Sequence, residues 1–324
     1  MIFNTSEMLF SLPFRMTVLK FAIEPMEEMV IPAYPAITIR GGLGYALKQK
    51  LCLFDVRTCR EKCQCPEKCS YTLSFEDREG ATTQAHPYIP YTRPYIIRVE
   101  KNYPSVIKNG ELFEFQIYLF GNAVDDYMSY IGAIRRFGEI GFGKKHVPFI
   151  IRTVKSVEPG IERIIFEGDR LLSEPAVLSF KNLLAIPEYR PFQLKLELVT
   201  PARVKHEGRY VKDLPFDLFV MNLIRRLNSI LYFHHQYELD PEWEAFWIDA
   251  SIDVDTVFSG WEYESFERFS TRQQQKMKLD GIIGEMVVEG DTLKELFPLL
   301  YAGQFLHIGK QAAFGFGEYK LSVY

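Results

Sequence analysis

The same order of secondary-structure elements is predicted twice along this chain of 324 residues. In each half, a strand is followed by a helix, two strands, a second helix and a last strand, which is the βαββαβ order of a ferredoxin-like domain. Both halves also place glycines between the second helix and the fourth strand. Since the chain is long enough for two domains, the repeat predicts an α+β protein with two ferredoxin-like (RRM-like) domains in tandem.

Hydrophobic periodicity and turn residues set the elements expected in the first half. Leu43, Ala46, Leu47 and Leu51 recur at helical spacing in the segment that begins at Arg40. Strands are expected at 12–23, 95–99, 112–120 and 147–154, and helices at 40–51 and 124–137.

In the second half, Leu194, Leu196 and Leu198 alternate with polar residues, the pattern of a strand with one buried face. Strands are expected at 192–204, 250–258, 281–288 and 318–323, and helices at 214–233 and 292–305. The resulting organisation is a first domain at 1–157 with a Cys-rich insertion at 52–90, a connecting region at 158–190, and a second domain at 191–324 with a glycine-rich loop at 309–317.

The charges of the chain are segregated along its length. The net charge is −4, but residues 238–267 hold ten acidic side chains and no Lys or Arg, so the remainder carries +6. Residues 135–152 hold five basic side chains against one acidic one. A basic face can bind nucleic acid despite an acidic total, so the composition does not exclude that class of function.

The chain shows no sign of a membrane or secretory segment. No apolar stretch reaches the ~20 residues that cross a bilayer, and the first residues lack the basic leader of a secretory signal. We therefore expect a reducing, cytoplasmic location, where cysteines are thiols or metal ligands and not disulfides.

Five cysteines lie between Cys52 and Cys69. Cys59 and Cys63, and then Cys65 and Cys69, form two pairs within the spacing of zinc ligands. Four thiolates can close a tetrahedral structural site, and they do not by themselves distinguish zinc from an iron–sulfur cluster. The alternative is a set of reduced thiols that bind no metal. Because a four-cysteine site leaves no open coordination position, a metal here would be structural.

A glycine-rich loop precedes the last predicted strand of each half, and lysines stand beside both loops. Lys144 and Lys145 adjoin the first loop, and Lys310 lies in the second. Glycines let a backbone approach a phosphate and point N–H groups at it, and lysines supply the charge. The structural alternative is a tight turn between helix and strand. Two such loops at equivalent places favour phosphate binding.

The end of the chain resembles a known family. Residues 297–319 are similar to the terminal glycine-rich signature of the CRISPR-associated RAMP endoribonucleases, with Gly309, Gly315 and Gly317 in its characteristic places. The blocks that also resemble this family are Trp261, Arg268, Ser270, Arg272 and Gln273, then Asp280-Gly-Ile-Ile-Gly, and Arg40-Gly-Gly-Leu-Gly-Tyr-Ala-Leu with the cysteines before Tyr71 and Phe75. The last block is similar to one branch of the family.

The resemblance implies a metal-independent endoribonuclease that cuts CRISPR repeat RNA in precursor crRNA and needs no cofactor for catalysis. In such a reaction the ribose 2′-OH attacks its own phosphate and leaves a 2′,3′-cyclic phosphate and a 5′-OH. This chemistry requires a base, an acid and positive charge for the transition state.

The family resemblance also indicates candidate catalytic residues. Relatives commonly place a catalytic histidine near the first helix, which makes His86 the leading candidate, although it can equally be an ordinary loop histidine. Tyr45 stands where the family motif often has histidine. Tyrosine, with a pKa near 10, is a poor base but can donate a hydrogen bond, and Lys48 follows about one turn later as a cationic partner.

Further residues are candidates for contact with RNA through charge or through a loop backbone. His146 can instead be a packing residue, and His307 a half-buried one. The helical spacing of Arg268 and Arg272 is at odds with the strand expected after them. The predicted RNA contacts are Arg40, Arg135, Arg136, Lys144, Lys145, His146, Arg268, Arg272, His307, Lys310, Gly309, Gly315 and Gly317.

Two other functions remain open on the sequence. Tyr45, in place of histidine, is compatible with a non-catalytic RNA-binding subunit of a guide-RNA complex. A metal-stabilised binding module outside CRISPR systems would require an accidental resemblance of the chain's end. The expected partners are repeat RNA and other CRISPR effector subunits, with no membrane. A homodimer is neither indicated nor excluded.

Overall fold

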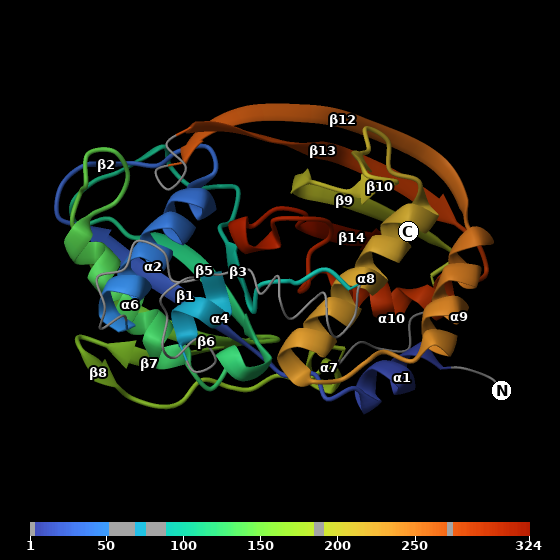
Figure 1. Cartoon of the computed structure of the whole chain (residues 1–324), viewed down its shortest axis with the longest axis horizontal. Coiled ribbons are helices and arrows are strands. Elements are labelled where there is room, and N and C mark those ends of the chain that lie inside the picture. Colours follow the sequence, from blue (N-terminus) through green and yellow to red (C-terminus); the bar gives the residue numbers. More distant parts are fainter. Residues whose placement is uncertain (1–3, 52–68, 76–88, 185–190, 271–274) are drawn as a thin grey trace. The chain divides into compact units, whose positions relative to one another are not determined.

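The structure is a computed structural model that describes residues 4–51, 69–75, 89–184, 191–270 and 275–324 (Figure 1). The chain divides into two compact units. The N-terminal unit comprises Pro13–Leu183 and Ser229–Tyr237, and the C-terminal unit comprises Met1–Leu12, Leu184–Asn228 and Glu238–Tyr324. None of the described helices is both long and apolar enough to cross a membrane.

The N-terminal unit is built on an antiparallel sheet with the strand order β3-β5-β1-β6-β7-β8. The strands are β1 (Met16–Pro25), β3 (Tyr95–Arg98), β5 (Phe113–Phe120), β6 (Phe149–Glu158), β7 (Ile161–Glu167) and β8 (Arg170–Leu171). The first four positions in this order hold the second, third, first and fourth strands of a βαββαβ unit, which is the ferredoxin-like arrangement.

The first strand occupies the middle of this sheet, and its side chains are almost all buried. β1 pairs with β5 on one side and β6 on the other, and eight of its ten residues are buried. Phe21 lies opposite Phe115, with the ring centroids 5.1 Å apart in a stacked arrangement. A strand buried in this way reads as a continuous apolar run, which is why the sequence predicted it.

Two helices of the N-terminal unit pack against each other. They are α2 (Pro35–Leu51) and α6 (Tyr127–Ile140), and they make the largest helix–helix contact among the described residues. A methyl group placed at Gly42 of α2 would lie 2.1 Å from the ring of Phe137 of α6, so glycine is needed for this close approach. The smaller elements are β2 (Met29–Val30) paired with β4 (Val106–Ile107), α4 (Ser70–Phe75), the 3-10 turn η1 (Gly121–Ala123) and α7 (Phe180–Leu183).

The C-terminal unit repeats the arrangement in an antiparallel sheet of order β12-β13-β9-β14. Its strands are β9 (Gln193–Ala202), β12 (Asp255–Ser270), β13 (Gln275–Glu289) and β14 (Tyr319–Val323), and its two ferredoxin-like helices are α8 (Phe216–His235) and α10 (Leu293–Gly303). From Ser229 onward, α8 belongs to the N-terminal unit. The unit also contains α1 (Thr5–Ser11), α9 (Pro241–Ile252), the hairpin β10 (Lys205–His206) with β11 (Arg209–Tyr210), and the 3-10 turn η2 (Ala312–Phe314). The tandem ferredoxin-like α+β fold is therefore confirmed.

Two boundaries differ from the sequence-based expectation because of helix starts. The segment 250–258, expected as a strand, is split: α9 occupies it up to Ile252, and β12 begins at Asp255. The side chain of Asp240 accepts the Glu242 amide at 2.9 Å, and Pro241 is the first helical residue, two strong signals for a helix start. In the same way α2 begins at Pro35 and not at Arg40.

Residues 158–190, for which we expected a connecting region, contain β7, β8 and α7. Both strands are hydrogen-bonded into the sheet of the N-terminal unit. Most of the expected Cys-rich insertion at 52–90 lies outside the described residues.

The close approach of α2 and α6 makes a prediction about two neighbouring glycines. Gly42→Ala should lower the free energy of unfolding by about 1–3 kcal/mol, because the methyl group overpacks the buried Phe137 ring. Gly41→Ala in the same helix meets nothing within 4 Å and should raise it by up to about 1 kcal/mol through helix propensity. Urea unfolding of both variants measures the difference. Equal effects of the two substitutions would show that Gly42 is not a packing requirement.

Candidate nucleic-acid interface

The terminal glycine-rich loop is folded tightly against the end of β9. Gly309, Gly315 and Gly317 have left-handed φ angles of 70°, 79° and 71°. A methyl group at Gly309 would lie 2.7 Å from the carbonyl oxygen of Arg203, and one at Gly317 only 1.9 Å from that of Ile308. Glycine is therefore required here by backbone geometry and by close packing.

Several amide groups of this loop are already used within the fold. The N–H of Lys310 donates to the Arg203 carbonyl at 2.8 Å, that of Gly315 to Ala312 at 2.8 Å, and that of Gly317 to Pro201 at 3.1 Å. These three amides therefore do not face a phosphate. The structural alternative, a tight turn, accounts for the glycines, and a phosphate bound here would have to be contacted by the side chains around the loop.

Three cations gather beside this loop, and we call Arg203, Lys205 and Lys310 the loop cluster. Lys310 and Lys205 are exposed. Desolvation, together with the positive charges of Lys205 and Arg203, lowers the pKa of the Lys310 ammonium. An anion bound beside these cations would favour the charged form of the ammonium, so its binding there would be stabilised.

The guanidinium of Arg203 is held in a fixed orientation. Only 8% of the residue is exposed. One terminal nitrogen donates to the Gln311 side chain at 2.8 Å, the other pairs with Asp280 at 3.1 Å, and the group lies 4.5 Å from the centroid of the Tyr210 ring.

The partner carboxylate of Arg203 is itself positioned by a tyrosine. The hydroxyl of Tyr263 donates to Asp280. Desolvation and this carboxylate raise the pKa of Tyr263 to about 12, so the hydroxyl stays protonated and remains a donor. The Asp280 of the family-like block is therefore a positioning residue for Arg203.

Sequence reasoning identified Lys310 but missed Arg203 and Lys205. The signal was present, because Arg203 and Lys205 stand at the end of the strand expected at 192–204. His307 is different from the expectation of an RNA contact. It is fully buried, and its Nδ1 lies 3.0 Å from the carbonyl oxygen of Phe316. A ring in this position supports the loop from inside and has no surface for RNA.

On the N-terminal unit, α2 presents two of the candidate catalytic residues. Tyr45 is 57% exposed, and its hydroxyl has no hydrogen-bond partner among the described residues. The Lys48 ammonium lies 5.6 Å from the centroid of the Tyr71 ring, and the Arg40 guanidinium 5.2 Å from that of Phe75. Both cations thus rest on aromatic faces of α4, as cation–π pairs. His86 lies outside the described residues.

The first glycine-rich loop exposes a basic tip. Phe142 and Val147 form a β-bridge that closes the loop, and Lys144, Lys145 and His146 between them are all exposed. The three side chains are therefore accessible to a ligand, and their contact with RNA stays a prediction. The loop is tight, since a methyl group at Gly141 would lie 2.1 Å from the carbonyl oxygen of His146.

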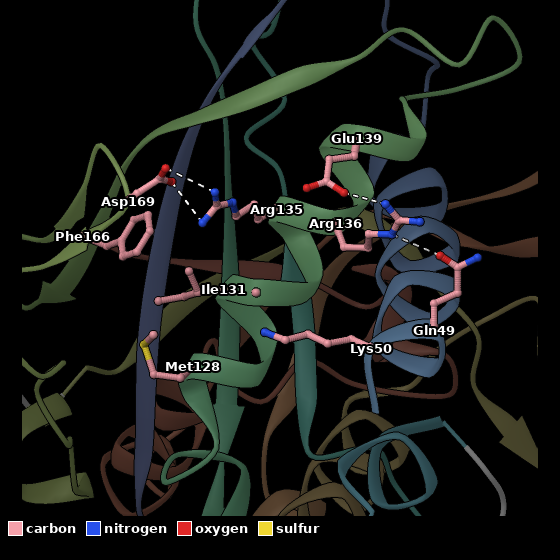
Figure 2. A pocket seen from close by; sticks show the side chains of 10 residues that line it. Gln49, Lys50, Met128, Ile131, Arg135, Arg136, Glu139, Phe166 and Asp169 are labelled. Atoms are coloured by element: carbon pink, nitrogen blue, oxygen red, sulfur yellow. Dashed lines mark hydrogen bonds and ion pairs between the residues drawn. The ribbon is translucent and has the colours of Figure 1, made fainter. Parts of the chain in front are cut away.

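The remaining cationic candidates have different surroundings. Arg135 and Arg136 are exposed near the end of α6, where they pair with Asp169 at 3.2 Å and Glu139 at 2.5 Å (Figure 2). Arg268 lies on β12 opposite Met277, which removes the helical spacing considered for it, and Arg272 lies outside the described residues.

The four-cysteine metal site stays a prediction. Cys59, Cys63 and Cys65 lie outside the described residues, and Cys69 is a half-buried free thiol just before α4. Elsewhere in the described part of the chain, no group of three or more His, Cys, Asp or Glu side chains is arranged to hold a metal.

Comparison with protein families matches both halves of the chain. A family model for the CRISPR-associated endoribonuclease Cas6 matches residues 196–319, and a model described as an N-terminal domain matches residues 12–177. A search of the curated proteins finds no match. Residues 196–319 therefore match the CRISPR-associated Cas6 endoribonuclease family.

Solved structures share the fold at low sequence identity. A chain of a partial Cas6-RT-Cas1–Cas2 complex has a TM-score of 0.57 and 13% identity over 98% of this chain, which spans only 47% of that longer chain. A Cas6 product complex has a TM-score of 0.53 and 14% identity, covering 95% of this chain and 99% of the other. A Thermus thermophilus Cas6 has a TM-score of 0.51 and 12% identity, covering 96% and 99%.

The loop cluster makes a prediction about salt-dependent RNA binding. Replacing Lys205 and Lys310 together with Gln should weaken binding of a repeat RNA and reduce the slope of log affinity against log salt by about 1–2, since each phosphate contact contributes just under one. Lys320→Gln, an exposed lysine on β14, is the matched control and should leave the slope unchanged. Fluorescence anisotropy at several salt concentrations gives both slopes. An unchanged slope for the double variant would exclude the loop cluster from the interface.

Proposed function

We propose that this protein is an endoribonuclease that processes precursor CRISPR RNA by cutting within the repeat. The observation that carries the proposal is the match of residues 196–319 to the Cas6 endoribonuclease, on a chain whose two units both have the ferredoxin-like strand order. The exposed cations at 144–145 and in the loop cluster supply charge for an RNA backbone.

The proposed reaction uses the ribose of the substrate and no metal. The 2′-OH loses its proton and attacks the adjacent phosphorus, and the bond to the 5′-oxygen of the next nucleotide breaks. That oxygen takes a proton, so the products carry a 2′,3′-cyclic phosphate and a 5′-OH. A base, an acid and a cation are sufficient for this transfer.

Three side chains are proposed for these roles. His86 accepts or donates the proton, because a histidine titrates near neutral pH. The exposed Tyr45 hydroxyl donates a hydrogen bond to a phosphate oxygen, and Lys48, less than one turn further along α2, supplies positive charge. The cation–π contact with Tyr71 keeps the Lys48 ammonium close to the helix surface.

A second candidate function is a non-catalytic RNA-binding subunit. It is favoured by one observation, the absence of any histidine from α2, where the exposed position 45 holds tyrosine. In that case the protein would hold guide RNA within a larger assembly. Related chains occur in complexes with Cas1 and Cas2, so other CRISPR proteins are the proposed partners under either function.

Chelator-resistant cleavage tests the proposed reaction. Incubated with cognate repeat RNA and a chelator, the protein should release a product ending in a 2′,3′-cyclic phosphate, and 2′-deoxy substitution at the scissile nucleotide should abolish release, because the attacking group is gone. Denaturing gels and mass spectrometry of the products measure this. Tight binding of the RNA with no product would instead establish the non-catalytic subunit.

The residue roles are separable by two substitutions. His86→Ala should lower the single-turnover cleavage rate by about 10²-fold or more, as loss of a general acid or base does, while RNA affinity stays the same. Tyr45→Phe removes only the hydroxyl and should lower the rate by a smaller factor, about tenfold, the value of one hydrogen bond to a charged group. If His86→Ala cleaves at the unchanged rate, His86 has no part in the reaction.

A further inference from the structure

The N-terminal unit contains a pocket that none of the proposed roles uses. It lies between α2, α6 and the turn that joins β7 to β8, and its volume is about 710 Å³ (Figure 2). This is within the ~300–1,000 Å³ of typical small-molecule sites. All of its lining residues belong to the N-terminal unit.

One wall of the pocket presents the ammonium group of Lys50. Lys50, near the end of α2, extends its side chain across α6, as Figure 2 shows. A methyl group at Gly132 of α6 would lie 1.9 Å from the Lys50 Nζ, so the ammonium rests directly against α6 at this glycine. No carboxylate among the described residues pairs with it.

Two guanidinium groups also line the pocket, and both already have partners. Arg135 pairs with Asp169 through both terminal nitrogens, and Arg136 pairs with Glu139 and donates to Gln49 at 3.2 Å. All four charged side chains are solvent-exposed, with exposures between 46% and 66%, so a phosphate bound in the pocket would compete with the carboxylates in the presence of water. With three cations and two carboxylates, the lining carries a net positive charge.

The floor of the same pocket is apolar. Met128 and Ile131 of α6 and Phe166 of β7 line it, and Figure 2 shows them on the side of α6 that also faces Asp169. Met128 is 41% exposed, so its flexible thioether is available to a ligand. Ile131 and Phe166 are almost fully buried, so Met128 is the apolar side chain that a ligand would mainly contact. A ligand that fits both walls therefore combines an anionic group with an apolar face, as a nucleotide does.

We propose that this pocket binds a single nucleotide, with its phosphate at Lys50 and Arg135 and its base on the apolar floor. Gln49, which also lines the pocket, lies one helical turn, about 6 Å, beyond Tyr45 on α2. The position is suited to the nucleotide next to the one being cut. In this form the inference rests on the proposed function. A free mononucleotide and a nucleotide within single-stranded RNA offer the same chemistry.

Two substitutions isolate the ammonium of Lys50. Gly132→Ala places a methyl group 1.9 Å from the present position of the Nζ, so the flexible end of the Lys50 side chain must shift, while helix propensity favours the variant. Lys50→Gln removes the charge and keeps the length of the stem. Gly41→Ala makes the same chemical change in α2 with open space around it, and is the matched control.

Calorimetric titration of the full chain with the four nucleoside 5′-monophosphates, the four nucleosides, inorganic phosphate and a single-stranded RNA hexamer tests the proposal. At least one monophosphate, or the hexamer, should bind the wild type and Gly41→Ala equally, and bind Gly132→Ala and Lys50→Gln about tenfold more weakly, as loss of one charged contact predicts. Binding of monophosphates identifies the free nucleotide, and binding of the hexamer alone identifies the RNA chain. The matching nucleoside and inorganic phosphate should both bind more weakly than the nucleotide.

The proposal is overturned if Lys50→Gln binds the same ligands with unchanged affinity, or if inorganic phosphate binds as tightly as any nucleotide or the hexamer. Cleavage of repeat RNA by the same variants separates this result from the fate of the proposed function. Lys50-dependent nucleotide binding by a chain that never cuts RNA would leave the pocket standing and reject the endoribonuclease. Normal cleavage without Lys50-dependent binding would support the endoribonuclease and reject the nucleotide pocket.

Discussion

The contact between α2 and α6 positions almost everything that the N-terminal unit presents to a ligand. At Gly42 the two helices approach so closely that the Phe137 ring occupies the space of a side chain. This contact sets the places of Tyr45 and Lys48 on α2 relative to Arg135 and Arg136 on α6. A rigid helix pair holds functional side chains more accurately than a loop can, so the small residue that permits the contact matters as much as the side chains it places.

The C-terminal unit reaches a similar result by different means. Amide groups of its glycine-rich loop donate hydrogen bonds to carbonyl groups at the end of β9, and the glycines are needed for the conformation and close packing of the loop backbone. The loop is thereby fixed, and the exposed ammonium of Lys310 comes to lie beside Arg203 and Lys205. A phosphate bound here would be contacted by cations held by the loop, and the Asp280–Tyr263 pair keeps one of these cations in place.

The fold was largely predictable from the sequence, because buried strands and amphipathic helices each produce a recognisable pattern of hydrophobic residues. β9, α8, α10 and β14 lie close to their expected positions. Helix α9 was not predicted, although Asp240 and Pro241 are signals for a helix start. The aromatic and apolar residues that follow them also suit a strand. The candidate site was harder to predict from the sequence. Burial of His307 and the cluster around Arg203 depend on residues brought together from distant parts of the chain, which no local pattern reports.

The division of the chain into units determines whether either half could be produced as a separate fragment. The chain passes between the units four times, because Met1–Leu12 belongs to the C-terminal unit and Ser229–Tyr237 to the N-terminal one. Within the N-terminal unit, His234 lies 2.8 Å from the Thr92 carbonyl and Ser229 donates to that of Pro90 at 2.6 Å. A fragment that stops near residue 190 would lose these partners, and a fragment that starts there would lose α1. The two halves look like modules, but neither is a complete module by itself.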